Sequence, residues 1–301
     1  MIVTKAFHFA VFKNSFISPL APFCYNHQFS CSHSVTIAYL LTTFPFFKNK
    51  NRYMPIKLSE ISTRAPKEFD KEQTKEKLVL LLEELDELQN LLYANGKHSV
   101  LVIIQGMDAS GKDGAVKNVF GTLNPLGVLA KSFKAPTEEE LSHDFLWRIH
   151  KYTPAKGMIQ VFNRSQYEDV LITRVHKWID EKTVGERMNA INNFEMLLQE
   201  HGQTIILKFY LHLSREKQHE RLNERLTIAK KHWKANPNDF IEATRWDDYM
   251  KAYEDCFEKC NLVPWTIVPA DQNWYKEYIL ASTLVDALKK LKMQYPPLKE
   301  Q

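Results

Sequence analysis

The sequence predicts an α/β protein built around a parallel β-sheet. Three continuous apolar segments, at 99–105, 157–162 and 204–213, have the composition of strands that are buried on both faces of such a sheet. Helical segments stand between them, and this alternation of strand and helix is typical of parallel sheets. A glycine-rich segment directly follows the first strand, because five of the nine glycines lie between Gly106 and Gly127.

The other elements follow in order along the chain. A helix over 70–95 carries leucine on one stripe and closes with an Asn-Gly pair, which often ends helices. Thr137 and Glu140 have the spacing of a capping box, which predicts a helix over 137–152. The remaining expected elements are helices at 185–201, 214–231, 245–259 and 275–293 and a short strand at 265–268.

Residues 1–53 differ in composition from the rest of the chain. They carry five basic residues, no Asp or Glu, and nine of the eighteen phenylalanines, whereas the other 248 residues hold 35 basic and 36 acidic side chains. The formal charge of +4 therefore belongs to this leader. A transit peptide should be rich in Arg, which occurs once here, and a secretory signal needs one uninterrupted apolar stretch. We favour a third interpretation, in which translation starts at Met54 and residues 54–301 form the functional domain.

Composition also excludes several classes of protein. No run of eighteen apolar residues occurs, so neither a membrane-spanning helix nor a membrane partner is expected. The nearly neutral body lacks basic patches interleaved with aromatic residues, which argues against a nucleic-acid partner. Beyond the leader only Cys256 and Cys260 remain, and we expect reduced, partly buried thiols in a cytoplasmic protein rather than metal ligands. Trp246, Tyr249 and Tyr253 have the spacing of a core-facing helical stripe.

The first candidate site follows the first strand. The segment GMDASGKD, from Gly106 to Asp113, fits the phosphate loop G-x-x-x-x-G-K-[ST] except at its last position. Between a strand and a helix, such a loop surrounds an anion with backbone N–H groups, and its Lys reaches a phosphate oxygen. The residues expected to bind phosphate here are Gly106, Met107, Ala109, Ser110, Gly111, Lys112, Asp113 and Gly114.

Two carboxylates of this loop depart from the motif. Asp113 stands where a Ser or Thr hydroxyl normally contacts Mg²⁺, and it serves either as a metal ligand or as an acid in the first turn of the helix. Asp108 lies inside the loop, where an unscreened carboxylate would repel phosphate. Its presence is explained if it holds a metal ion or faces the phosphoryl acceptor.

A second polar cluster follows the second strand. In phosphate-loop folds the end of a neighbouring strand supplies the acidic partner of the metal, but here that strand ends in Asn163 and the acids come a turn later. Ser165 and Glu168 have capping-box spacing, so Glu168 has a structural explanation of comparable weight. Asp169 has no such explanation, and we favour it as functional.

Basic residues form the third group. Arg164 and Arg174 either pair with carboxylates or clamp a transferring phosphate, and we favour the clamp. Lys217, Arg221 and Arg225 recur every four residues and make one basic helical face, which would close over a polyanion as a lid. The alternative is a ladder of ion pairs with Glu residues along a solvated helix. An excess of five basic over acidic residues across 208–234 favours the polyanion.

Taken in order, these segments resemble the polyphosphate kinase 2 family. The similarity covers about 70–297 and is carried by GMDASGKDG, NPLGV, SFKAPTEEELSHDFLWR, FNRSQYEDVL, TRVH, RWDDYMKAYED and WTIVPAD. The resemblance implies a three-layer, thymidylate-kinase-like phosphate-loop fold with a helical lid at about 214–245. It also implies phosphoryl transfer between inorganic polyphosphate and nucleoside mono- or diphosphates, with Mg²⁺ or Mn²⁺ as cofactor, by a homo-oligomer that is a dimer or a tetramer.

The resemblance further assigns roles to individual residues. Asp108, Lys112, Arg164 and Asp169 match the catalytic residues of the family, with Asp108 and Asp169 as Mg²⁺ ligands. The nucleotide-binding residues it implies are Asn163, Glu168 and Asp169, and those lining the polyphosphate groove are Lys112, Arg164, Arg174, Arg221 and Arg225. GKDG and N-R-S-x-Y-E-D are similar to the subgroup that uses both AMP and ADP, where Glu168 is associated with accepting the monophosphate. An ADP/GDP-only member and a small ATP-dependent kinase are the alternatives.

Overall fold

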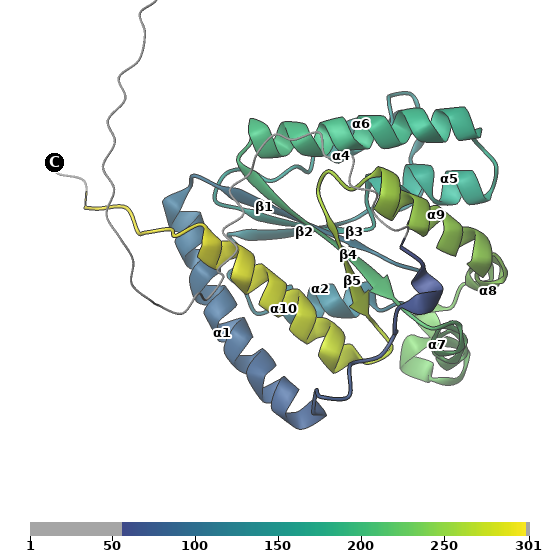
Figure 1. Cartoon of the computed structure of the whole chain (residues 1–301), viewed down its shortest axis with the longest axis horizontal. Coiled ribbons are helices and arrows are strands. Elements are labelled where there is room, and N and C mark those ends of the chain that lie inside the picture. Colours follow the sequence, from purple (N-terminus) through teal and green to yellow (C-terminus); the bar gives the residue numbers. More distant parts are fainter. Residues whose placement is uncertain (1–55, 299–301) are drawn as a thin grey trace, which may run out of the picture. The chain divides into compact units, whose positions relative to one another are not determined.

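The computed structural model describes residues 56–298, and the expectations for residues 1–53 lie outside this part of the chain. Five parallel strands form one sheet there, in the spatial order β2-β3-β1-β4-β5 (Figure 1). The strands are β1 (Ser99–Gln105), β2 (Val128–Ser132), β3 (Ile159–Asn163), β4 (Thr204–His212) and β5 (Trp265–Pro269). The predicted α/β fold with a parallel sheet is confirmed.

Helices cover both faces of the sheet, which is the middle of three layers (Figure 1). One face packs against α1 (Lys71–Asn95), α2 (Lys112–Phe120) and α10 (Asn273–Lys290), and the other packs against α6 (Glu181–Glu200) and α9 (Trp246–Lys259). The central strand β1 serves both cores, because Val100 and Val102 belong to the first and Leu101 and Ile103 to the second. Burial on both faces explains its continuous apolar sequence.

Helix α1 begins and ends where its sequence predicts. The Asp70 carboxylate accepts hydrogen bonds from the backbone N–H groups of Glu72 and Gln73, at 3.0 and 2.9 Å, and so caps the first turn. Gly96 follows the last turn in the left-handed conformation, with φ +63°, and its N–H donates to the Leu92 carbonyl. The helix expected over 70–95 is therefore confirmed.

The helix expected over 137–152 is wrong in length. Thr137 and Glu140 do form the predicted capping box, but the segment contains two short helices, α3 (Glu138–Leu141) and α4 (Trp147–His150). The Ser142 hydroxyl donates to the Glu139 carbonyl, and the Asp144 carboxylate accepts from the backbone N–H of Leu146. These side chains bond to backbone groups that a longer helix would need, so the helix stops between them.

Strand β2 has no counterpart among the sequence-based expectations. It is an edge strand that pairs with β3 alone, and its residues are half-buried or exposed. It carries Lys131 and lacks the apolar run that marks a strand buried on both faces. Strand β3 also begins later than expected and extends to Asn163, because Gly157 forms a turn with φ +85° before it.

The lid region consists of three separate elements at the carboxyl end of β4 (Figure 1). They are the helix α7 (Arg215–Thr227), the 3-10 helix η3 (Ala229–Lys234) and the helix α8 (Pro237–Thr244). The Ser214 hydroxyl caps α7 by accepting from the backbone N–H of Lys217 at 3.2 Å. The single helix expected over 214–231 ends earlier, at Thr227, and α8 was not expected.

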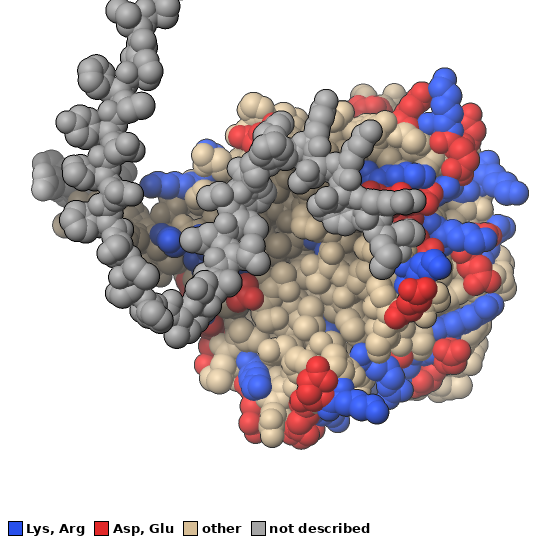
Figure 2. Space-filling model, viewed as in Figure 1, with Lys and Arg blue, Asp and Glu red and all other residues tan. Residues whose placement is uncertain are grey.

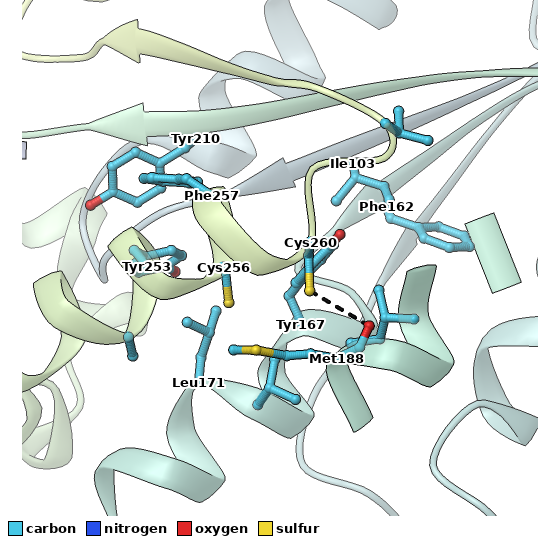
Figure 3. Packing of buried hydrophobic residues seen from close by; sticks show 14 of the residues in the cluster. Ile103, Phe162, Tyr167, Leu171, Met188, Tyr210, Tyr253, Cys256, Phe257 and Cys260 are labelled. Carbon is cyan, nitrogen blue, oxygen red and sulfur yellow. Dashed lines mark hydrogen bonds between the residues drawn. The ribbon is translucent and has the colours of Figure 1, made fainter. Parts of the chain in front are cut away.

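The remaining short elements are the 3-10 helix η1 (Leu58–Glu60), the 3-10 helix η2 (Gln166–Val170) and the helix α5 (Ile172–Val175). Cys256 and Cys260 lie in the core between α9 and the sheet, where both are free and buried (Figure 3). Tyr249 and Tyr253 are buried in the same core, so the predicted core-facing stripe is confirmed. Within residues 56–298, no helix combines the length and the apolar character that crossing a membrane requires.

Candidate active site

The phosphate loop connects β1 to α2, and two of its glycines are required by their surroundings. Gly106 has φ +151°, and a Cβ there would lie 2.9 Å from the Leu211 carbonyl oxygen. Gly111 has φ +93°, and a Cβ there would lie 2.6 Å from the Lys276 ammonium nitrogen. A larger residue would strain the backbone at both positions. At Gly106 it would also collide with a backbone atom, whereas at Gly111 the close atom is the end of a flexible lysine side chain.

Lys112 is the first residue of α2 and is held against the loop. Its ammonium group donates to the carbonyl oxygens of Gly106 and Met107, at 2.7 and 3.1 Å. Burial, reinforced by the positive charge of Arg164, lowers the pKa of Lys112 from 10.5 to about 8. The side chain is thus a cation at neutral pH, placed among the groups that would surround a phosphate.

Asp108, Arg164 and Glu168 form a connected group at one end of the loop. The Arg164 guanidinium donates to the Asp108 carboxylate and, at 3.2 Å, to the Glu168 carboxylate. Burial raises the pKa of Asp108, but Arg164 and Lys112 lower it further, so this pKa lies below its ordinary value. Arg164 also has φ +64°, a left-handed conformation that costs an ordinary residue about 1 kcal/mol.

A cavity of about 590 Å³ opens beside this group, between the loop, the end of β3, the lid and α10, and we call it the active-site cavity. The basic residues that line it are Lys112, Arg164, Arg221, Arg225, Lys231, Lys234 and Lys276. The acidic residues that line it are Asp108, Asp113, Glu224, Asp239 and Glu277. Seven basic against five acidic side chains make this surface suited to an anion that carries several charges.

The lid contacts the phosphate loop directly through α7. One terminal nitrogen of Arg221 donates to the carbonyl oxygens of Ala109 and Ser110, at 3.0 and 3.1 Å. The Gln218 amide donates to the Asp108 carbonyl oxygen at 3.1 Å. These contacts bind the first turns of the lid to the loop that it covers.

The basic face expected on α7 divides into two parts. Arg221 and Arg225 line the active-site cavity, and Arg225 also pairs with Asp239 of α8. Lys217 does not line the cavity and instead pairs with Glu220 along the helix, at 2.6 Å. The ladder interpretation therefore describes Lys217, whereas the position of the two arginines is the one that polyanion binding requires.

Asp113 and Asn163 lie together at the cavity and are joined to the lid. The Asp113 carboxylate accepts from the Asn163 amide and from the Lys234 ammonium group, at 2.8 Å in each case. Lys234 belongs to η3, so this contact connects the far part of the lid to the first turn of α2. Asp113 lies in the first turn of α2 and also lines the active-site cavity, so both of its interpretations stay predictions.

Asp169 is not where the metal-ligand prediction placed it. Its carboxylate is buried beside Arg148, at 3.4 Å, and its backbone carbonyl accepts from Arg187 at 2.9 Å. It does not line the active-site cavity, whereas Asp108 does. Burial raises the pKa of Asp169 in spite of the two arginines. Its contacts make it an anchor for the end of the second polar cluster.

Two further expectations need correction. Arg174 does not line the cavity: its guanidinium pairs with Glu181 at 2.7 Å and with Asp255 at 2.8 Å, so the ion-pair alternative describes it and the clamp does not. The capping box of Ser165 and Glu168 is absent from the described chain, because the Glu168 side chain pairs with Arg164.

Lys276 is a site residue that the sequence analysis missed. It is fully buried, and its ammonium group donates to the Gly111 carbonyl at 3.2 Å and to the Asn273 side chain at 3.0 Å. Burial, with the nearby charge of Arg221, lowers the pKa of Lys276 to about 8. One signal was present in the sequence, since Lys276 is in helical register with the buried leucines of α10.

The loop, the cavity and the lid together define the class of the protein, a phosphate-loop α/β protein of the kinase type. Comparison with known families is more specific. The model of the family described as Polyphosphate kinase 2 (PPK2) matches residues 68–296, and the chain belongs to this family.

Known relatives agree with this assignment. A Meiothermus ruber protein named AMP/ADP-polyphosphate phosphotransferase is 44% identical over 231 residues, which cover 76% of this chain and 86% of the relative. A Rhodopseudomonas palustris protein named ADP-polyphosphate phosphotransferase is 42% identical over 240 residues, which cover 75% and 83%. The crystal structure of polyphosphate kinase 2 from Arthrobacter aurescens TC1 matches with a TM-score of 0.79 and 43% identity, covering 82% of this chain and 89% of that one.

Proposed function

We propose that this protein transfers phosphoryl groups between inorganic polyphosphate and nucleoside mono- and diphosphates, converting AMP to ADP and ADP to ATP. The observation that carries the proposal is the position of Arg164. Its guanidinium binds both Asp108 of the phosphate loop and Glu168, the carboxylate associated with accepting the monophosphate. The loop that would hold the donor and the residue that would meet the acceptor are therefore parts of one connected site.

Polyphosphate would occupy the active-site cavity. The loop N–H groups and Lys112 would hold its terminal phosphoryl group, and Arg225, Lys231 and Lys234 of the lid would contact the phosphates that follow. Arg221, one nitrogen of which donates to two loop carbonyls, would keep the lid and the loop together while the substrate is bound. The excess of basic side chains offsets the charge of the polyanion.

The reaction needs no nucleophile from the protein. A terminal phosphate oxygen of the nucleotide attacks the terminal phosphorus of polyphosphate in line with the P–O bond that breaks, and the shortened polyphosphate keeps the electrons of that bond. Lys112 and Arg164 would stabilise the negative charge that spreads over the oxygens of the transferring group. Excluding water beneath the lid would favour the nucleotide over hydrolysis.

The cavity residues fit a divalent cation. Mg²⁺ commonly takes one or two protein carboxylates and completes its shell with phosphate oxygens and water. Asp108 and Asp239 line the same cavity, and the charge of Asp108 adds to burial in raising the pKa of Asp239. We therefore assign Mg²⁺, or Mn²⁺ in its place, to Asp108 and Asp239, where the bound ion would offset the charge of two polyanions.

Nucleotide preference and assembly complete the proposal. Glu168 lines, with Asp108, Arg164, Tyr249 and Tyr253, a second cavity of only about 20 Å³, which is too small for a nucleotide. We therefore assign to this side of the site only the terminal phosphate of the nucleotide acceptor, which would meet Arg164 there. Both the AMP/ADP-type and the ADP-type relatives are similar to the chain, so an ADP/GDP-only activity is the alternative.

We also propose that the protein is a homo-oligomer, either a dimer or a tetramer. Light scattering on the purified protein would measure its mass in solution.

One coupled assay tests the function. The protein is incubated with polyphosphate and Mg²⁺ but without ATP, in parallel with AMP, ADP, GMP and GDP. We expect ADP and then ATP from AMP, and none after chelation of the metal until Mg²⁺ or Mn²⁺ is returned. Product from ADP and GDP alone would select the alternative. No product with polyphosphate, but phosphorylation with ATP as donor, would identify an ATP-dependent kinase instead.

A further inference from the structure

A fully buried ion pair lies in the core beside the second polar cluster. The Lys208 ammonium group, on β4, is 2.8 Å from the Glu195 carboxylate, on α6, and neither side chain is exposed to solvent. Neither residue lines the active-site cavity or takes part in the proposed reaction. Burying two charges generally costs as much stability as their attraction returns. The pair therefore needs an explanation other than stability alone.

The contacts of the pair point to that explanation. Lys208 donates to three oxygen atoms, each at 2.8 Å, namely those of the Glu195 carboxylate, the Tyr167 hydroxyl and the Cys260 carbonyl. The second oxygen of Glu195 accepts from the Tyr167 hydroxyl at 2.7 Å and from the Gln166 amide at 3.2 Å. All the donors of Lys208 are used, and two of the partners are consecutive residues of η2. Figure 3 shows Tyr167 lying beside Cys260 in this core.

These two residues of η2 stand between the two that face the site. Arg164 precedes them, in its left-handed conformation, and Glu168 follows them directly. The segment is held at its start by a bond from the Arg164 N–H to the Ile104 carbonyl, at 3.1 Å. At its end it is held by Arg187, which donates to the Asp169 carbonyl at 2.9 Å. In the middle, the buried pair holds Gln166 and Tyr167, and the Gln105 amide of β1 holds the Ser165 hydroxyl at 3.0 Å.

We propose that Lys208, Glu195 and Tyr167 are positioning residues for the transfer, an inference that rests on the proposed function. From the buried core they fix the backbone of η2, and this sets the distance of Arg164 and Glu168 from the phosphate loop. A misplacement of about 1 Å at a reacting centre can reduce a rate by about 10²-fold, so a rigid attachment beneath the site has a catalytic value. The charged pair is suited to this because its bonds are directional, whereas apolar packing tolerates small shifts.

Tyr167→Phe is the sharpest test, because it removes both bonds between the Tyr167 hydroxyl and the pair. It leaves the ion pair in place, together with the longer bond from the Gln166 amide to Glu195. The matched control is Tyr210→Phe, which removes a hydroxyl from the same buried core, where it contacts only the Met250 sulfur at 3.6 Å. We expect Tyr167→Phe to lower kcat for AMP phosphorylation about tenfold or more, with KM for polyphosphate changed less than about twofold. Tyr210→Phe should keep kcat within about twofold of the wild type, because it leaves η2 attached.

Amide hydrogen exchange gives a second measurement that does not depend on activity. Peptides covering 164–169 should exchange faster in Tyr167→Phe than in the wild type and in Tyr210→Phe, at equal melting temperatures. With an active wild type, both the lower kcat and the faster exchange are required, and the absence of either would overturn the inference. A wild-type protein that transfers no phosphoryl group would refute the proposed function, and the exchange comparison would then decide whether Tyr167 holds the segment.

Discussion

Asp108 is an unexpected residue in a phosphate loop, because an unscreened carboxylate there would repel phosphate. Its carboxylate accepts from Arg164 and lines the active-site cavity, and its pKa lies below the ordinary value, so it is ionised at neutral pH. Asp108→Asn keeps the shape of the side chain and removes its charge. We expect a loss of transfer of about 10²-fold or more, because the variant would lose the pairing with Arg164 and the metal. Steady-state assays measure the loss.

The same variant should remain folded. Gln218 contacts the backbone carbonyl of Asp108, which the substitution leaves in place. Its melting temperature should therefore lie within about 3 °C of the wild type, corresponding to less than about 1 kcal/mol for a domain of this size. Near-normal turnover in a folded variant would contradict the role assigned to Asp108.

Lys112 gives the protein a characteristic pH dependence. Because its pKa is lowered to about 8, the ammonium form is lost as the pH rises through about 8, and kcat/KM should fall there. Lys112→Ala should lose about 10²-fold in kcat at pH 7. The fall should persist in Lys276→Gln, which removes the other buried lysine with a pKa of about 8. A pH profile of kcat/KM for the wild type and for Lys276→Gln would measure this, and a fall that disappears in that variant would assign the titration to Lys276.

The titration of Lys112 does not itself destabilise the fold in this pH range. The folded pKa of Lys112 lies below its ordinary value of 10.5, so between about 8 and 10.5 the unfolded chain binds more protons than the folded one. The contribution of this group to the free energy of unfolding therefore rises with pH across that window, and is lost as the pH falls through about 8. Activity and the stability contribution of Lys112 should change in opposite directions.

Residue-level prediction succeeded where a motif is continuous in the sequence and failed where a partner comes from elsewhere. The loop from Gly106 to Asp113 is such a continuous motif, and the structure places it at the cavity. Asp169 looked functional because its partner Arg148 lies 21 residues earlier in the chain, on a different element, and no local spacing relates the two residues. Asp239 and Lys276 reach the cavity from α8 and α10, and no local spacing relates them to the loop.

The lid elements make different contacts with the site, and two lysines allow a matched comparison. Lys234 of η3 lines the cavity and pairs with Asp113 of α2, whereas Lys217 of α7 pairs with Glu220 on its own helix. Lys234→Ala should raise KM for polyphosphate about tenfold, the effect of losing one charged contact of about 1.4 kcal/mol. Lys217→Ala should leave KM within about twofold. Initial rates across polyphosphate concentrations would measure both, and equal effects would show that the lid acts by total charge alone.

Strands were predicted where an apolar run marks them, which includes the edge strand β5 (Trp265–Pro269). Strands β1, β3 and β4 have neighbours on both sides, and the apolar runs in their sequences predict them. Strand β2 has one neighbour and a mixed sequence, so no apolar run marks it. Pro237 explains where α8 starts, because proline is suited to the first position of a helix and cannot continue one that precedes it. The end of α7 at Thr227, where Ile228 is extended, has no such marker in the sequence.

At the scale of the whole molecule, the net charge and the charge of the site have different origins. The formal charge of +4 comes from residues 1–53, and the other 248 residues carry nearly equal numbers of basic and acidic side chains. On the face drawn in Figure 2, Lys and Arg are interspersed with Asp and Glu around α7, α8 and α9. The local excess of basic residues at the active-site cavity, rather than a one-signed surface, is what suits a polyanion.

Because the charge of residues 1–53 is separate from the charge of the site, we expect two truncations to have different outcomes. The family match begins at residue 68, and η1 (Leu58–Glu60) is the first element of the described domain. Removing residues 1–53 should change kcat and KM by less than about twofold, because the site is built from residues beyond 105.

Removing residues 1–62 also deletes Leu58, which is 2% exposed, and its backbone contacts with Glu254, at 2.8 Å, and His212, at 3.1 Å. Loss of that burial, about 2 kcal/mol, should lower the melting temperature by about 4–8 °C. Calorimetry and the coupled assay on both truncated proteins measure these effects, and lower activity after removal of residues 1–53 alone would give the leader a role in function.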